Sequence, residues 1–297
     1  MADGRPLQRS SQHSFTILTD RELPMKLLIL ADMHLDEITD VEVLRTLGEA
    51  IARVGQEADA LIIAGDLTEA ALHRWPSAIR WLGKHYPTAQ TVFIPGNHDY
   101  YGGRLDTLDE DLERLCHAEG ASFGQCLRMD LGDTRVLMTT LWTDMLLFDA
   151  DGDAFDQRSL WHARVMMPDY GYGGIMIGED NLPALPEHTV SVHIRQRAWL
   201  SAELERPWAG KTVVVTHHAP SATVSGAISS LSPCFGSNLD HLIERHRPEA
   251  WIFGHTHRPA ELRTPGGTLL RNVSLGYEHE LHLEKIFERV RKGLINL

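Results

Sequence analysis

The stretch Phe93–Asp99, with the sequence FIPGNHD, shows a pattern that recurs along the rest of the chain. An apolar, β-rich run from Thr91 to Ile94 stops at Pro95-Gly96, which is typical of a buried strand that ends in a turn. Polar side chains that can bind metals or transfer protons follow immediately. Ligands of open α/β sheets bind at the carboxyl ends of the strands, so this turn is a candidate functional site.

Short apolar runs alternate with segments of helical spacing on both sides of this stretch. We predict strands over 26–31, 60–64, 91–94, 212–216 and 250–253, and helices over 41–54, 71–85, 105–117, 190–204, 238–244 and 279–290. Strands separated by helices of about 10–15 residues indicate βαβ units and a parallel sheet. Two hairpins are predicted, over 122–140 and 262–271.

The N-terminal end and the middle of the chain lack this regular alternation of strands and helices. Residues 1–24 are polar and lack the features of a signal peptide, so we expect a poorly ordered extension and take Met25 as the native start. Residues 25–297 are predicted to form a single domain. Its segment of about 142–189 contains several prolines and no regular period, and is predicted to be an irregular lid insertion.

Composition argues against some classes of main partner. The 297 residues carry a net charge of 28 − 41 = −13, which disfavours nucleic acids and anionic membranes as main partners. A phosphate-bearing small molecule stays compatible, because bound cations can reverse the local field. No apolar run approaches about 18 residues, so no membrane-spanning helix is predicted. The three cysteines form no C-x-x-C pair, and we expect free thiols in the cytoplasm.

Candidate ligands follow five predicted strands in the same way. They are Asp32 and His34, then Asp66, then Asn97 and His98, then His217 and His218, and finally His255 and His257. Carboxylate, imidazole and amide oxygen together suit Mn, Fe or Zn. The i, i+2 spacing in Asp-x-His and His-x-His can place both side chains on one side of a strand end. Glycines at 65, 96 and 254 would allow sharp turns there.

In this order the motifs resemble those of the calcineurin-like metallophosphoesterases, over about residues 26–276, and look most like the bacterial phosphodiesterase-type branch. The resemblance implies a four-layer αββα sandwich of two mixed β-sheets flanked by helices, with a two-metal site. It implies one metal held by Asp32, His34, Asp66 and His257, and a second held by Asp66, Asn97, His217 and His255.

The same resemblance implies the chemistry. Two divalent or trivalent metal ions, expected to be manganese with iron or zinc as alternatives, would generate a hydroxide that attacks a small phosphate diester or monoester. His98 would face the phosphate and donate a proton to the leaving group, and Asp99 could orient it. His218 is expected to be a supporting or structural group.

Two alternatives compete with this hypothesis. Serine/threonine protein phosphatases of the superfamily usually show Gly-Asp-x-Val-Asp-Arg-Gly, whereas residues 65–69 here read Gly-Asp-Leu-Thr-Glu. The missing Asp-Arg removes a phosphate-binding arginine and disfavours a protein phosphatase. A catalytically silent metal-binding scaffold is the second alternative. Such relatives usually lose the phosphate-facing histidine or several ligands, and this chain has lost none, which favours an enzyme.

Overall fold

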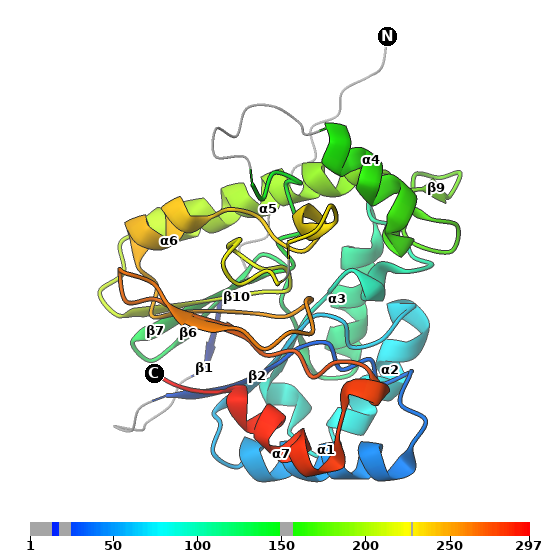
Figure 1. The fold of residues 1–297 in the computed structure, drawn as a ribbon. Helices are drawn as coiled ribbons and strands as arrows, with labels where there is room; N and C mark the ends of the chain where they lie inside the picture. The colour runs from blue at the N-terminus through cyan, green and yellow to red at the C-terminus, as the bar shows by residue number, and fades with distance from the viewer. Residues whose placement is uncertain (1–13, 18–24, 149–156, 227) are drawn as a thin grey trace.

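The computed structural model describes residues 14–17, 25–148, 157–226 and 228–297, which form two large mixed sheets flanked by helices (Figure 1). The larger sheet has the order β1-β6-β7-β10-β11-β13-β12 and the smaller β14-β2-β3-β4-β5. The strands of the larger sheet are β1 (Ser14–Ile17), β6 (Leu127–Leu131), β7 (Thr134–Thr139), β10 (Lys211–Thr216), β11 (Ala250–Phe253), β12 (Glu261–Arg263) and β13 (Leu269–Asn272). Those of the smaller sheet are β2 (Lys26–Leu30), β3 (Ala60–Ala64), β4 (Thr91–Ile94), β5 (Ser122–Phe123) and β14 (Leu294–Asn296).

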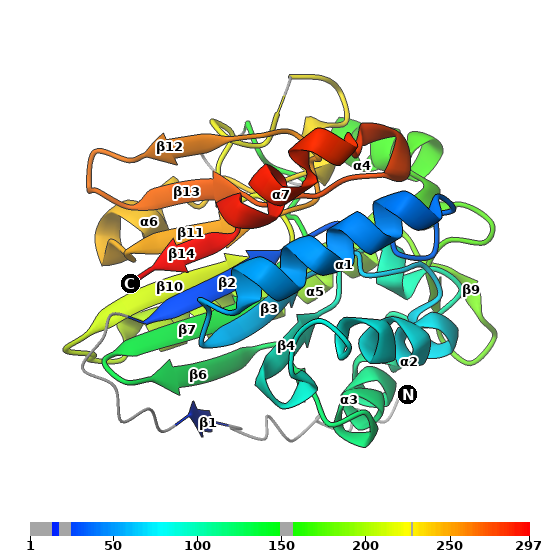
Figure 2. The same ribbon diagram turned by 90° about the horizontal axis from the view of Figure 1, so that it is seen from below.

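Helices cover the outer face of each sheet, so the predicted four-layer αββα architecture is confirmed. Figure 2 shows α1 and α7 lying across the smaller sheet, on the side away from the larger one. The helices on this side are α1 (Val41–Gly55), α2 (Ala71–Leu82), α3 (Leu108–Ala118) and α7 (Leu283–Lys292). The larger sheet packs against α5 (Pro186–Glu205) and α6 (Asp240–His246).

The period-2 alternation of β2 explains how the layers form. Leu27 and Ile29 pack between the two sheets, while Leu28 and Leu30 point the other way into the core beneath α1 and α7. All four side chains are fully buried. A strand that is covered on both faces reads as a continuous apolar run, which is why β2 was recognisable from sequence.

Parallel pairing brings the functional strand ends together. In the smaller sheet β2 pairs in parallel with β3, and β3 with β4, and in the larger sheet β10 pairs in parallel with β11. The two sheets meet at this edge, where Ala31 N–H donates to Val273 O at 3.4 Å and Leu275 N–H donates to Ala31 O at 2.9 Å. The segments that follow β2, β3, β4, β10 and β11 therefore gather at one place.

The predicted hairpin over 122–140 is wrong only at its start, residues 122–126. Ser122–Phe123 forms β5, which pairs in parallel with β4 in the smaller sheet, and only β6 and β7 form the antiparallel hairpin, in the larger sheet. Cys126, whose φ of 50° lies in the left-handed region, separates the two. The chain turns at this point and crosses from one sheet to the other.

Both ends of the chain contribute strands that were not predicted. Ser14–Ile17 pairs in parallel with β6, and the rest of the expected 1–24 extension lies outside the described residues. Leu294–Asn296 pairs antiparallel with β2 and forms one edge of the smaller sheet. The tail helix begins at Leu283, later than predicted, because a 3₁₀ turn occupies Glu278–Glu280.

The segment predicted to be an irregular lid is partly regular. It contains α4 (Gln157–Met166), a 3₁₀ turn at Pro168–Tyr170 and a small ribbon of β8 (Met176–Ile177) and β9 (Leu182–Pro183). Pro186 does not break a helix but starts α5, because the first helical position needs no backbone N–H. Within the described ranges no helix combines the length and apolar character needed to cross a bilayer.

Candidate metal centre

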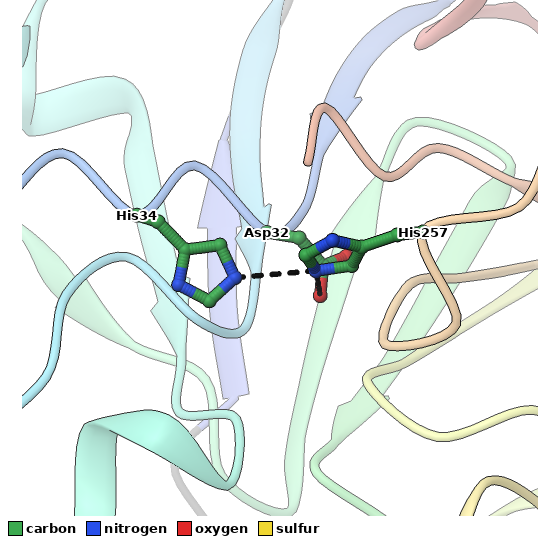
Figure 3. Close-up of side chains that lie close together, drawn as sticks. All are labelled: Asp32, His34 and His257. Carbon is green, nitrogen blue, oxygen red and sulfur yellow. Dashed lines mark hydrogen bonds and ion pairs between the residues drawn. The ribbon is translucent and has the colours of Figure 1, made fainter. Parts of the chain in front are cut away.

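The predicted ligands converge at the shared edge of the two sheets. Two clusters form there, each with donor atoms that all lie within 4.8 Å of one another. The first comprises Asp32, His34 and His257, and the second comprises Asp66, His217 and His255. Figure 3 shows the first cluster, with the imidazoles of His34 and His257 turned toward each other beside the Asp32 carboxylate. Residues more than 200 positions apart in sequence thus meet as predicted.

The first cluster presents its donor atoms to a common point. The Nε2 atoms of His34 and His257 lie 3.2 Å apart, and His257 Nε2 lies 3.3 Å from Asp32 Oδ1. Nitrogen ligands sit about 2.0–2.1 Å from zinc, so two of them on one ion are separated by about 3 Å, as found here. His257 Nδ1 contacts Glu280 Oε2 at 2.8 Å, which turns Nε2 toward the cluster.

The second cluster is built around Asp66. Its Oδ1 accepts a hydrogen bond from the His98 backbone N–H at 3.0 Å, which leaves Oδ2 free. Oδ2 lies 3.4 Å from His217 Nε2 and 3.9 Å from His34 Nε2. The same oxygen therefore faces both clusters, the geometry that a bridging ligand requires. Asn97 Oδ1 completes this side at 3.1 Å from His217 Nε2.

Supporting contacts select the tautomers needed for metal binding. His217 Nδ1 lies 2.9 Å from the Ala64 carbonyl oxygen, so this nitrogen carries the proton and Nε2 is available as a ligand. His255 Nε2 is buried and has no hydrogen-bond partner among the described residues. A buried polar atom without a partner is costly, and a metal ion would satisfy it. The donor set and this orphaned nitrogen fit the two metals that the resemblance implies.

The backbone is strained where the ligands sit. Five predicted ligands have a positive φ in the left-handed region: Asp32 (55°), His34 (40°), Asp66 (53°), His255 (67°) and His257 (49°). Non-glycine residues rarely adopt this conformation, and each instance costs about 1–3 kcal/mol. Strain of this kind is concentrated at functional sites, where surrounding contacts maintain it. The backbone thus points to the same residues as the side-chain geometry.

Gly96 and Gly254 are required by close approach rather than by a turn. A Cβ on Gly96 would lie 2.2 Å from Asp66 Oδ1, and one on Gly254 would lie 2.4 Å from Asp32 Oδ2. Neither glycine has a positive φ, whereas Gly65, at 93°, does turn in the way that was predicted. The sequence identified the right glycines, but for two of them the physical reason is the space that the carboxylates occupy.

We expect Gly96→Ala to displace Asp66 and so to weaken metal binding and destabilise the fold by about 1–3 kcal/mol. Urea unfolding of the metal-free protein measures the stability, and metal analysis measures the binding. Gly171→Ala is a matched control, because the atom nearest to its Cβ would be the Pro168 carbonyl oxygen at an ordinary 3.4 Å. Full metal content with parental stability in Gly96→Ala would contradict this account.

Charge and burial set the protonation states of the ligands. Burial raises the pKa of Asp66, but the neighbouring histidines outweigh this and hold it well below its usual value. Burial lowers the pKa of His34 to about 4 and that of His255 well below its usual value. Burial also opposes protonation of His217, but Asp66 raises the pKa of that ring to about 9. A metal at this position would displace the proton from His217.

The ring of His98 lies beside the clusters. Among the described residues, it forms no hydrogen bond with a predicted ligand. Its Nδ1 lies 3.4 Å from Glu69 Oε1, and its Nε2 lies 3.5 Å from the Tyr277 hydroxyl. Burial lowers the pKa of His98, but Asp66, Asp169 and Glu69 raise it above its usual value. The role of His98 in proton transfer stays a prediction, and Glu69 makes the contact with its ring that was expected of Asp99.

Asp99 is fully buried and holds the surrounding loops. Its carboxylate accepts hydrogen bonds from the backbone N–H groups of Gly96 and Asp66, both at 2.8 Å, and of Thr68 at 3.1 Å. It also accepts one from Trp75 Nε1 at 2.8 Å, so Trp75 is a packing residue with a polar contact to the site. The 3₁₀ turn at His98–Tyr100 directs the adjacent side chains differently, which explains why Asp99 does not orient His98.

His218 is buried behind the second cluster, as expected for a supporting group. Its Nδ1 lies 3.3 Å from the Thr140 carbonyl oxygen, and its ring packs against Trp142 and His255 with centroids 5.3 and 4.3 Å away. Burial and the neighbouring His217 lower its pKa to about 3. A neutral, packed imidazole fits a role in fixing the position of His255.

Sequence reasoning missed four side chains around the centre. They are Glu69 beside His98, Tyr277 stacked on His34, Glu280 behind His257, and Asp169 behind Asn97. Glu69 lies three residues after Asp66 in an identified motif, and Asp169 lies in a stretch considered only as part of the lid. Tyr277 and Glu280 carry no local motif, and they reach the site because the chain after β13 returns across the end of β2.

A family model for calcineurin-like phosphoesterases matches residues 25–259 of the chain. The chain is 31% identical over 96 residues to a metallophosphoesterase of Helicobacter pylori, a match that covers 30% of this chain and 25% of that protein. It is 32% identical over 91 residues to a transmembrane protein with a metallophosphoesterase domain from Danio rerio, covering 31% of this chain and 20% of that protein. The chain thus spans a quarter or less of the length of these relatives.

Solved structures resemble most of the chain. Phosphopantetheinyl hydrolase from Mycobacterium tuberculosis superposes with a TM-score of 0.64 at 16% identity, over 93% of this chain and 96% of that one. A dimetal phosphatase from Danio rerio superposes with a TM-score of 0.54 at 14% identity, over 89% and 90%. At these identities the likeness concerns the fold.

Proposed function

The chain belongs to the calcineurin-like phosphoesterase family, and from this premise we propose that it is a two-metal phosphoesterase that hydrolyses small phosphate diesters or monoesters. The observation that carries the proposal is the placement of Asp66 Oδ2, which lies between the two ligand clusters, 3.4 Å from His217 Nε2 and 3.9 Å from His34 Nε2. One carboxylate oxygen shared by two clusters is the arrangement that a binuclear site needs.

Each metal position has its own set of protein ligands. Asp32, His34 and His257 would hold one ion, and His217, His255 and Asn97 would hold the other, with Asp66 between them. Bound divalent ions would polarise the phosphoryl oxygens and lower the pKa of water at the site. Manganese remains our preferred metal, with iron or zinc as alternatives, because the donors mix carboxylate and amide oxygen with imidazole.

His98 is the residue that we assign to the leaving group. Glu69 beside Nδ1 would hold the ring so that Nε2 faces outward, toward the Tyr277 hydroxyl. The side chain of His98 is 17% exposed, so a substrate oxygen can reach it. From Nε2 the imidazole would donate a proton to the departing alkoxide.

Hydrolysis of p-nitrophenyl phosphate and bis-p-nitrophenyl phosphate tests the proposal. We expect activity with added Mn²⁺ that EDTA abolishes, and the ratio of the two rates separates a monoesterase from a diesterase. Asp66→Asn purified in parallel controls for contaminating phosphatases. Absence of hydrolysis with Mn²⁺, Fe²⁺ and Zn²⁺ alike would contradict the proposal and favour the catalytically silent scaffold.

A panel of small phosphate esters then addresses the substrate. The panel should include nucleotide diesters and a phosphopantetheinyl diester, the latter because of the name of the mycobacterial structure. A phosphopeptide serves as the negative control, because the chain lacks the Asp-Arg of the protein phosphatases and is not expected to hydrolyse it. A small phosphate ester as partner and a cytoplasmic location both stay predictions.

A further inference from the structure

We propose that Asp169, a residue of the insertion, positions the metal ligand Asn97 and thereby sets the affinity of the second metal position. The inference rests on the proposed two-metal function and goes beyond it, because it assigns part of the metal site to a segment outside the ligand motifs. Asp169 lies in the 3₁₀ turn Pro168–Tyr170, between α4 and β8, and is 2% exposed.

Both oxygens of the Asp169 carboxylate accept a hydrogen bond. Oδ1 accepts from Asn97 Nδ2 at 2.9 Å, and Oδ2 accepts from the Tyr101 hydroxyl at 3.2 Å. Asn97 is itself 1% exposed, so its amide has no access to bulk water and must find its partners within the protein.

This contact decides which end of the Asn97 amide faces the metal position. An amide has a donating and an accepting end, and the two are interchangeable in shape. Because the acceptor Asp169 stands on one side, the NH₂ group must point there, and Oδ1 is directed to the opposite side, 3.1 Å from His217 Nε2. Only the oxygen can bind a cation. Without Asp169 the amide could rotate and present NH₂ to the metal.

Backbone hydrogen bonds also join the insertion to the segment that follows Asn97. The position of Asp169 relative to Asn97 therefore does not depend on their side-chain contact alone. Gly102 N–H donates to Gly174 O at 2.9 Å, and Leu105 N–H donates to Met176 O at 2.8 Å. The Tyr170 hydroxyl lies 2.8 Å from Thr189 Oγ1 at the start of α5. The 3₁₀ turn is therefore held on both sides, and a carboxylate on it has a fixed position relative to Asn97.

Mn²⁺ titration of the metal-free protein, with free Mn²⁺ followed by electron paramagnetic resonance, tests this role without measuring activity. We expect Asp169→Ala to lower the Mn²⁺ affinity of the position that includes Asn97 by about 10–100-fold, as is typical when the partner of a metal ligand is lost. The Mn²⁺ affinity of the other position should not change. Asp169→Asn should bind close to the parent, because its carbonyl oxygen can still accept from Asn97. Asp180→Ala, which removes an exposed carboxylate of the same insertion, is the matched control.

A double-mutant cycle separates positioning from general stabilisation. If Asp169 acts through Asn97, then Asp169→Ala has no further effect on Mn²⁺ affinity in an Asn97→Ala background. If the losses of Mn²⁺ affinity caused by the two substitutions multiply in the double variant, the inference is overturned. Parental Mn²⁺ affinity in folded Asp169→Ala, or equal weakening of both metal positions, would overturn it as well. If Asp169→Ala does not fold, Asp169→Ser takes its place, since its hydroxyl is one bond shorter and cannot keep the same contact.

The parent protein separates this inference from the proposed function. If the parent binds fewer than two ions of Mn²⁺, Fe²⁺ and Zn²⁺ alike, the two-metal centre itself fails. If the parent binds two and Asp169→Ala binds both with the same affinities, only the role of Asp169 fails.

Discussion

Asp66→Asn is expected to empty both metal positions and to abolish phosphoester hydrolysis. The His98 backbone N–H donates to Asp66 Oδ1, so an asparagine would turn its own oxygen to that donor and its NH₂ group toward the two clusters. The negative charge is lost at the same time. Both changes fall on a residue predicted to bind both ions directly, so the loss of affinity should exceed the 10–100-fold typical of indirect partners. Metal content by mass spectrometry and hydrolysis rates measure the outcome.

Asp180→Asn is the control for Asp66→Asn, because it removes the same charge from an exposed position. It should keep two metals and parental rates. If Asp66→Asn itself retained two metals per chain, the shared carboxylate would not be the centre of the site, and the assignment of both clusters would have to be revised.

The second large effect concerns the proton donor. His98→Ala is expected to keep both metals and to lower kcat by about 10²–10⁴-fold, the usual contribution of a positioned general acid. The ring makes its hydrogen-bond contacts with Glu69 and Tyr277 and meets the predicted ligand His34 only through an edge-on ring contact, with centroids 5.0 Å apart, so its removal leaves the donor atoms of both clusters in place. Metal content and steady-state kinetics of the same preparation measure both halves of the prediction.

Leaving groups provide the sharper test of His98. An alkyl phosphate needs a proton on its departing oxygen, whereas p-nitrophenolate leaves without one. His98→Ala should therefore lower kcat more for an alkyl phosphate than for a p-nitrophenyl phosphate. An equal loss on both substrates would show that His98 binds phosphate and does not donate the proton. Loss of a metal from His98→Ala would show that the residue is a ligand.

The core strands and the positions of the candidate ligands could be predicted because their signals are local. β3 and β4 have the predicted bounds, since each is a continuous apolar run that ends at a glycine or proline. The candidate ligands follow their strands within a few residues, and parallel pairing brings those of each sheet to one edge, whereas the meeting of the two sheets was implied by the family resemblance. Asp32 and His257, 225 residues apart and at the ends of strands in different sheets, were placed together by the family resemblance.

The remaining features depend on contacts that no local pattern encodes. The chain crosses from β5 to β6 through the left-handed backbone conformation of Cys126. The strand β14 is stabilised by its pairing with β2 rather than by the preferences of its own three residues. Glu280 reaches His257 only after the chain has returned from β13. The role of Asp99 was missed because sequence adjacency to His98 does not reveal in which direction a 3₁₀ turn sends each side chain.

The left-handed backbone at Asp32, His34, Asp66, His255 and His257 limits which replacements at these positions can be interpreted. Alanine would add a conformational penalty of about 1–2 kcal/mol to the loss of the ligand, and a β-branched residue would add more. Asparagine and glycine adopt this geometry readily. Alanine variants would therefore combine a backbone penalty with the loss of the ligand, whereas asparagine variants would report mainly on the loss of the ligand.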